Sequence, residues 1–218
     1  MNGAHRAVVF DLDGTLIDSA PDLHAAVNVA LETLGRPHIS LKQVIGFIGN
    51  GVSKLVERAL MATGGASPEM HTEALALFME SYSANMTRLT VPYPGVVACL
   101  SGLRDRDIPM GLCTNKPQEP AQLICDALGL SSFFGVVLGA GRDMAHKPDP
   151  APLLTCIEAL GAAPDTTVYV GDGAVDHETA RRASVPFRFF TGGYLNSPLP
   201  PIAEDHRFDD WSDHGLWQ

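Results

Sequence analysis

The chain has 218 residues, of which 45% are hydrophobic and 18% are charged, and its formal net charge is −10. This composition is that of a folded protein with one sizeable core, and it excludes a disordered chain. The negative charge opposes nonspecific attraction to nucleic acids and anionic lipids, so we expect neither nucleic acid nor membrane as a partner. An anionic substrate would therefore need a local cation or a metal ion.

The first apolar run, AVVF at residues 7 to 10, predicts a buried strand that runs into Asp11 and Asp13. These acids interrupt the run, so it does not resemble a signal peptide, and no uncharged stretch reaches the roughly 18 residues of a membrane span. The four cysteines contain no CxxC pair and lie in apolar segments, which favours small buried side chains over a metal or redox role. We therefore expect a cytoplasmic protein.

Residues 19 to 90 show helical periodicity throughout. Apolar residues repeat at spacings of three and four from residue 23 to residue 34, and SLKQ at 40–43 fits a capping box that begins a second helix. A third helix is expected from Val52 to Leu60, and a fourth begins at Ser67 and continues to Tyr82. Four short helices in a row predict a small all-helical unit.

From residue 92 onward, short apolar runs alternate with helical stretches. The expected strands are 108–113, 133–139, 167–171 and 186–190, and the expected helices lie near 96–106, 118–128, 150–160 and 176–184. With the first strand, this pattern predicts an α/β fold with a doubly wound parallel (Rossmann-like) sheet and an inserted helical domain. We assign residues 1–15 and 91–218 to the α/β core and residues 16–90, the helical insertion, to the second domain. The polar tail, 204–218, carries two tryptophans that we expect to dock on the surface.

Polar side chains follow the predicted strands, at the points where each strand ends. The carboxyl ends of parallel strands meet at one crevice, so these side chains should lie close together. They are Asp11 and Asp13 after the first strand, Thr114 and Asn115 after the second, Lys147 after the third, and Asp172 and Asp176 after the fourth.

Carboxylates that converge in a crevice repel one another unless a cation lies among them, and oxygen ligands of this kind suit Mg²⁺. We expect Mg²⁺ at Asp11 and Asp172. Lys147, the Thr114 hydroxyl and the backbone amides after Asp11 could bind the oxygens of a phosphoryl group. Asp176 could instead cap the helix that follows it. The whole set indicates a site for phosphoryl transfer.

The two carboxylates that follow the first strand are expected to have different roles. Asp11 would be the nucleophile and form an aspartyl-phosphate. Asp13 would protonate the leaving alkoxide and then activate water. Gly14 permits the tight turn that brings the backbone close to the phosphate, and Thr15 can orient this loop.

Four motifs, FDLDGT, TNK, KPDP and GDGAVD, occur in the order of the four motifs of the haloacid dehalogenase superfamily of phosphatases, which the chain resembles over its whole length. The helical insertion is similar to the small helical cap of that superfamily. The segments DSAPDL, GNGVSKLVERAL, PYPGV and TNKP resemble its phosphoglycolate phosphatases. The resemblance implies Mg²⁺-dependent hydrolysis of 2-phosphoglycolate, a small phosphorylated metabolite, and we expect a monomer or a homodimer.

The resemblance also implies roles for individual residues. Asp11 is the nucleophile and a metal ligand, and Asp13 is the acid and base that offers its backbone carbonyl to the metal. Asp172 is the other metal ligand, with Asp176 in support. Thr114 and Lys147 are placed with the catalytic groups, and Gly14, Thr15 and Asn115 at the substrate.

Three positions depart from the usual pattern of this family. Gly173 replaces a serine and Val175 an asparagine, which affects the hydrogen bonds around Asp172. Ser184 stands where a glycine commonly ends the last helix. The segment TGGY at 191–194 is interpreted either as a loop that lines the site or as a simple turn.

Substrate selectivity is expected to lie in the helical insertion, because the core binds only the phosphate. Glycolate carries a carboxylate, so a cation of the insertion should meet it. Lys54 and Arg58 are candidates, although both could be ordinary solvent-facing charges. The alternatives are a sugar-phosphate phosphatase, a phosphomutase of the β-phosphoglucomutase kind, and a non-catalytic binding protein on the same fold, which only the altered GDGAVD favours.

Overall fold

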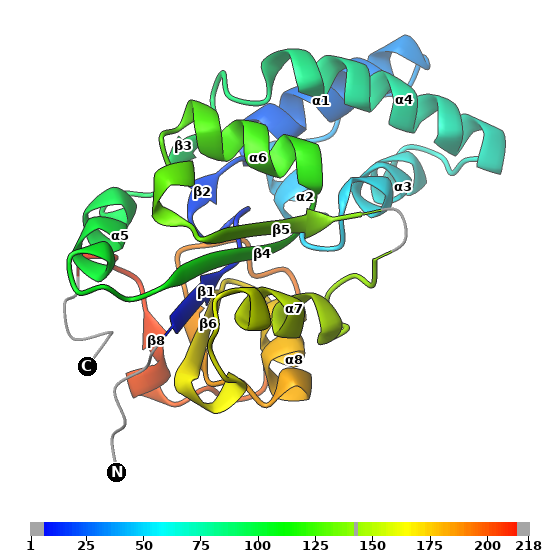
Figure 1. The fold of residues 1–218 in the computed structure, drawn as a ribbon. Coiled ribbons are helices and arrows are strands. Elements are labelled where there is room, and N and C mark those ends of the chain that lie inside the picture. Colours follow the sequence, from blue (N-terminus) through cyan, green and yellow to red (C-terminus); the bar gives the residue numbers. More distant parts are fainter. Residues whose placement is uncertain (1–6, 142–143, 213–218) are drawn as a thin grey trace.

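Six parallel strands form the main sheet of the computed structural model, which describes residues 7–141 and 144–212. Their order across the sheet is β5 (Val136–Ala140), β4 (Met110–Pro117), β1 (Ala7–Phe10), β6 (Thr167–Gly171), β7 (Phe187–Phe190) and β8 (Arg207–Phe208). The chain extends the sheet on one side of β1 and then, from β6, on the other. This arrangement confirms the doubly wound parallel sheet, and it places the ends of β1 and β6 side by side (Figure 1).

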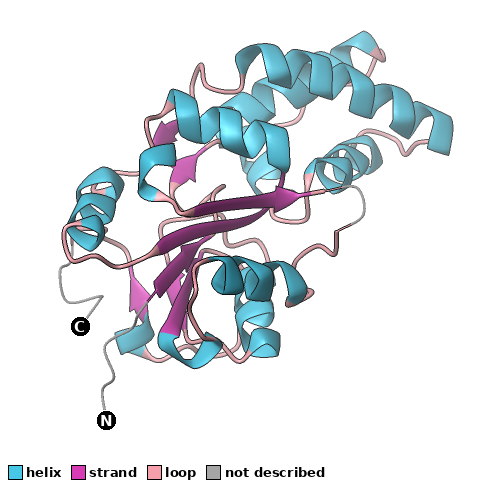
Figure 2. Ribbon diagram, in the orientation of Figure 1, coloured by secondary structure: helices cyan, strands magenta, loops and turns pink. Residues whose placement is uncertain are grey.

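Helices cover both faces of this sheet, as Figure 2 shows. The side chains of Val8 and Phe10 in β1 pack in one cluster with α5 (Val96–Arg104) and α6 (Gln118–Ala127). Val9 points the other way and packs with α7 (Ala151–Ala159) and α8 (Ala174–Ala183). All four residues of β1 are buried, which is the reason for its uninterrupted apolar sequence.

The helical insertion contains α1 (Ala20–Thr33), α2 (Leu41–Ile45), α3 (Val52–Ala62) and α4 (Pro68–Asn85). Ser40 and Gln43 form the expected capping box, and the Ser67 hydroxyl accepts from the backbone of Met70 at the start of α4. Figure 1 shows α1 and α4 lying side by side. Their apolar faces belong to the same buried cluster as one face of the sheet, so the insertion packs directly on the core.

A two-stranded ribbon, which the sequence analysis did not predict, lies where the helical insertion joins the core. The strand β2 (Ile17–Asp18) pairs antiparallel with β3 (Val91–Pro92). The buried carboxylate of Asp22 accepts from the backbone amides of Leu89 and Thr90 and from the Thr90 hydroxyl. Both ends of the insertion are therefore held together, while its division from the core as a separate domain stays a prediction.

The C-terminal segment corrects one expectation. Residues 207–208 form the edge strand β8, and Trp211 is only 2% exposed. The Trp211 ring lies 6.0 Å from Phe10 and 4.9 Å from Phe208, between centroids. The prediction that the tryptophans dock on the surface is thus wrong for Trp211, which fills the core, and Trp217 lies outside the described residues.

Two strand boundaries also differ from the prediction. The strand β4 continues to Pro117 instead of ending at residue 113, with an irregular register between Cys113 and Pro117. The strand β5 begins at Val136, because residues 131–133 form a single 3₁₀ turn. All four cysteines are unpaired and buried, which confirms the prediction for them. In the described ranges, every helix is too short or too polar to cross a membrane.

Candidate active site

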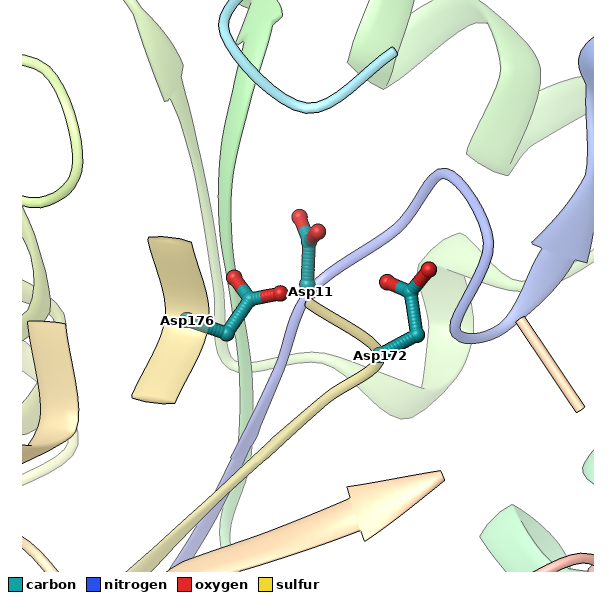
Figure 3. Close-up of side chains that lie close together, drawn as sticks. All are labelled: Asp11, Asp172 and Asp176. Atoms are coloured by element: carbon teal, nitrogen blue, oxygen red, sulfur yellow. The ribbon is translucent and has the colours of Figure 1, made fainter. Parts of the chain in front are cut away.

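Three buried carboxylates converge at the carboxyl edge of the sheet, as Figure 3 shows. Asp11 follows β1, Asp172 follows β6, and Asp176 lies in the first turn of α8. One oxygen of each lies within 4.8 Å of the others. The structure therefore brings together the acids that the sequence analysis placed at strand ends.

The electrostatics of this cluster favour a bound cation. Burial raises the pKa of Asp11 to about 6, with a further rise from Asp176, against the opposing effect of Lys147. Burial and the two neighbouring acids raise the pKa of Asp172 well above its usual value. The Oδ1 atom of Asp11 is buried and accepts no hydrogen bond of good geometry. A cluster of three buried carboxylates, whose oxygens are hard ligands, fits a hard divalent cation such as Mg²⁺.

Lys147 supplies the positive charge beside this cluster. Its Nζ lies 2.9 Å from Asp11 Oδ1 and 2.6 Å from Asp176 Oδ1, and it donates to the Tyr169 hydroxyl at 2.8 Å. Burial alone would lower the pKa of Lys147, but Asp11 and Asp176 outweigh that effect and raise the pKa above its usual value. The lysine therefore stays charged next to the predicted nucleophile.

Asp13 contacts a residue to which the sequence analysis gave no role, Lys116. The Nζ of Lys116 lies 2.9 and 3.1 Å from the two carboxylate oxygens of Asp13, and the Ser19 hydroxyl donates to the same carboxylate. Lys116 also donates to the hydroxyl of Tyr82, a residue of α4 in the helical insertion, at 2.8 Å. The signal for Lys116 was its position in β4, two residues after Thr114, because such residues lie on the same face of a strand.

Gly14 and Thr15 lie against Asp172, one of the candidate metal ligands. The Thr15 hydroxyl donates to Asp172 Oδ1 at 2.9 Å, and the Tyr194 backbone amide donates to Asp172 Oδ2 at 2.6 Å. Gly14 has φ +85°, and a Cβ at this position would lie 2.3 Å from Asp172 Oδ2. A glycine is therefore required for the loop to pass over the Asp172 carboxylate. The Tyr194 contact also shows that the TGGY segment lines the site.

Thr114 and Asn115 lie near the end of β4. The Thr114 hydroxyl is buried and accepts from the Lys116 amide at 3.2 Å. The side chain of Asn115 exchanges hydrogen bonds with the backbone of Lys147 and donates to the Gly49 carbonyl of the helical insertion at 3.1 Å. Asn115 thus links the two loops that border the site to β4.

A small pocket of about 30 Å³ lies between the core and the helical insertion, and one wall contains Asp11 and Asp13. A second pocket, of about 20 Å³, shares these two acids and extends past Asp172 and Asp176. The other residues that line the first pocket are Thr114, Asn115 and Lys116 from the core, and Leu23, Ile48, Gly49, Gly51, Val52 and Leu55 from the insertion.

The two cations that were expected to meet the substrate lie elsewhere. Lys54 is half exposed and pairs with Glu57 at 2.7 Å. Arg58 donates to the Phe47 carbonyl at 2.9 Å and to Asn50 at 2.8 Å. Neither is among the described residues that line the two pockets.

The three departures from the family pattern have distinct local effects. Gly173 has no side chain to cap α8, but its amide donates to Asp176 Oδ2 at 3.2 Å, so Asp176 also fills the capping role. Val175 lines the second pocket. Ser184 ends α8 with φ 56°, in the left-handed region that favours glycine.

Comparisons with known proteins agree with this geometry. A family model described as haloacid dehalogenase-like hydrolase matches residues 8–190. The phosphoglycolate phosphatase of Cereibacter sphaeroides is 44% identical over 194 residues, which are 88% of each chain. Phosphoglycolate phosphatase 1 of Pseudomonas aeruginosa is 41% identical over 92% of this chain and 74% of its own. The crystal structure of a predicted phosphoglycolate phosphatase from Haemophilus somnus 129pt superposes with a TM-score of 0.90 at 30% identity, and covers 98% of this chain and 97% of its own.

Proposed function

The chain belongs to the haloacid dehalogenase-like hydrolases, and we propose that it is a Mg²⁺-dependent phosphatase that hydrolyses 2-phosphoglycolate to glycolate and phosphate. The observation that carries this proposal is the convergence of Asp11, Asp172, Asp176 and Lys147 next to Asp13, at the wall of a small pocket. The relatives named phosphoglycolate phosphatase support the substrate.

The metal would be held by the carboxylates of Asp11 and Asp172 and the backbone carbonyl of Asp13, with Asp176 in support. When bound, Mg²⁺ would neutralise these acids and draw negative charge from the phosphoryl oxygens. Lys147 is already 2.9 Å from Asp11, so it can bind a phosphoryl oxygen beside the nucleophile. The hydroxyl of Thr114 would donate to another phosphoryl oxygen.

The reaction proceeds in two displacements at phosphorus. A carboxylate oxygen of Asp11 attacks phosphorus, and the bond from phosphorus to the ester oxygen breaks as Asp13 gives its proton to that oxygen. Glycolate leaves, and the phosphoryl group remains on Asp11. Asp13 then takes a proton from water, the water oxygen attacks phosphorus, and inorganic phosphate is released with Asp11 restored.

Closure of the helical insertion over the crevice would exclude bulk water during the first displacement. The insertion and the core share the pocket, and Asn115 joins them through Gly49.

We place the division into two domains at the β2 and β3 ribbon. The four buried, unpaired cysteines favour a cytoplasmic location.

The test is phosphate release from 2-phosphoglycolate, a panel of sugar phosphates and p-nitrophenyl phosphate, with Mg²⁺ and with EDTA. Preference for 2-phosphoglycolate that requires Mg²⁺ supports the proposal. Equal rates across the panel would contradict the assignment of 2-phosphoglycolate as the substrate. Isomerised products would favour a phosphomutase. If the protein releases phosphate from none of these compounds, the result would favour the alternative of a non-catalytic binding protein.

A further inference from the structure

The pocket beside Asp13 contains one cation. Among the described residues that line the two pockets at the site, Lys116 is the only lysine or arginine, and there is no histidine. Its side chain is 1% exposed, so bulk solvent does not screen its charge. Lys54 and Arg58 were expected to bind the carboxylate of the substrate, but they contact other partners outside this pocket. A negatively charged leaving group would therefore meet Lys116.

Lys116 is held in place by one residue of the core and one residue of the helical insertion. Its Nζ contacts Asp13, a core residue, at 2.9 Å and the hydroxyl of Tyr82, from the helical insertion, at 2.8 Å. The Tyr82 ring lies 5.0 Å from the ammonium and stacks on Phe78. The ammonium has three N–H donors for three acceptor atoms, the two oxygens of Asp13 and the Tyr82 hydroxyl. A substrate carboxylate that takes one N–H would replace one Asp13 oxygen, while the other oxygen and Tyr82 keep their contacts.

The position of Lys116 matches the chemistry of the leaving group. Asp13 must lie against the ester oxygen that it protonates. In 2-phosphoglycolate the carboxylate is one carbon away from that oxygen, so it must lie close to Asp13 as well. Among the described residues, the one cation in an ion pair with Asp13 is Lys116, which contacts both of its carboxylate oxygens. The side chains of Leu23, Val52 and Leu55 in the remaining walls of the small pocket are apolar and offer a carboxylate no hydrogen bond.

We propose that Lys116 is the residue that binds the carboxylate of the leaving group and so selects a small acid over a neutral alcohol. This inference rests on the proposed phosphatase function and assigns its specificity to the core strand β4 instead of to a cation of the helical insertion. Tyr82 serves as the anchor that fixes the ammonium in the pocket.

The experiment compares kcat/KM for 2-phosphoglycolate and for 2-hydroxyethyl phosphate, which has an alcohol in place of the carboxylate. We expect Lys116→Met to reduce the preference for the acid by roughly 10- to 100-fold, since it removes a charge-assisted hydrogen bond. Lys116→Arg keeps the charge and should retain more of the preference than Lys116→Met. Lys42→Met, at an exposed lysine of α2, is the matched control and should leave the preference unchanged.

Each outcome has a separate meaning. If Lys116→Met lowers both rates by the same factor, the lysine acts only through Asp13 and the inference is overturned, while the phosphatase proposal stands. A loss of preference in Lys54→Met instead would assign the role to the helical insertion. If the unmodified protein hydrolyses neither ester, it is the proposed function that has failed.

Removal of the Lys116 charge leaves Asp13 without its main partner, so folding is checked by circular dichroism. Lys116→Gln, which keeps an N–H donor, replaces Lys116→Met if the latter does not fold. If neither variant folds, the same comparison is made with Tyr82→Phe, which keeps Lys116 and removes its hydrogen bond to the Tyr82 hydroxyl. Tyr82→Phe should reduce the preference for the acid several-fold, and an unchanged preference would overturn the inference.

Discussion

The backbone amide of Tyr194 donates a hydrogen bond to Oδ2 of Asp172 at 2.6 Å, while the hydroxyl of the same tyrosine contacts the start of the helical insertion. That hydroxyl accepts from the Ala20 amide at 2.9 Å and donates to Asp18. One residue of the TGGY segment thus joins a proposed metal ligand to the ribbon where the insertion begins. The position of the Asp172 carboxylate therefore depends on this loop.

We predict that Gly193→Ala disrupts the metal site. A Cβ on Gly193 would lie 2.2 Å from the Gly14 carbonyl oxygen and 2.3 Å from Asp172 Cβ, so the loop must move away from Asp172. Apparent Mg²⁺ affinity in the phosphatase assay should fall roughly 10- to 100-fold, the range seen when groups that orient metal ligands are changed. Gly102→Ala is the matched control, because a Cβ there meets nothing within 4 Å. Equal Mg²⁺ affinity in both variants would contradict the role given to this loop.

Ser184→Gly should stabilise the protein. Ser184 has φ 56°, a left-handed conformation that costs a residue with a side chain more than glycine. The free energy of unfolding should rise by about 0.5–1 kcal/mol, measured by urea denaturation, with phosphatase activity unchanged. Ser184→Ala keeps the Cβ and should give no gain. A glycine variant no more stable than the original chain would show that the conformation carries no strain.

The stability of the metal-free protein should fall as the pH rises. Burial raises the pKa of Asp11 from 3.8 to about 6, and burial together with the neighbouring acids raises the pKa of Asp172 well above its usual value. A carboxyl whose pKa is higher in the folded state stabilises the fold below its unfolded pKa, and this stabilisation is lost as the pH rises through the folded pKa. In EDTA, the free energy of unfolding should therefore be lower at about pH 8 than at about pH 5.

Mg²⁺ should reverse this pH dependence. The metal binds the deprotonated carboxylates, so its stabilising effect should be large at about pH 8 and small at about pH 5. At roughly 100 times its dissociation constant, Mg²⁺ should add about 2.7 kcal/mol to the free energy of unfolding. Urea denaturation at both pH values, with Mg²⁺ and with EDTA, measures this. Equal stabilisation at the two pH values would mean that these acids do not bind the metal.

Much of the fold could be predicted because its signals are local and periodic. The buried run of β1, the capping box at Ser40 and Gln43, and the apolar repeats of the helices appear directly in the sequence. The ribbon of β2 and β3 has two residues in each strand, too few for any periodicity. The strand β8 is equally short, and Trp211 lies among polar residues, so only its contacts with Phe10 and Phe208 reveal that it belongs to the core.

The site was predictable where it depends on topology. Asp11 and Asp172 follow strands that are neighbours in a parallel sheet, so their convergence follows from the strand order. Lys116 was missed because its role depends on Tyr82, a residue of the helical insertion 34 positions away. Periodicity could place Tyr82 on the buried face of α4, but it could not show that the Tyr82 hydroxyl lies against the end of β4.

The central claim is that Asp11 is the nucleophile of a phosphatase. The most direct test is phosphate release from 2-phosphoglycolate by the unmodified protein and by Asp11→Asn, with Mg²⁺ present. We predict that Asp11→Asn lowers kcat by at least about 1,000-fold, because it removes the group that accepts the phosphoryl. In EDTA at about pH 8, the variant should unfold in urea no earlier than the original chain, because the raised pKa of Asp11 means that its ionised form destabilises the fold. An Asp11→Asn protein that releases phosphate at the original rate would contradict the account.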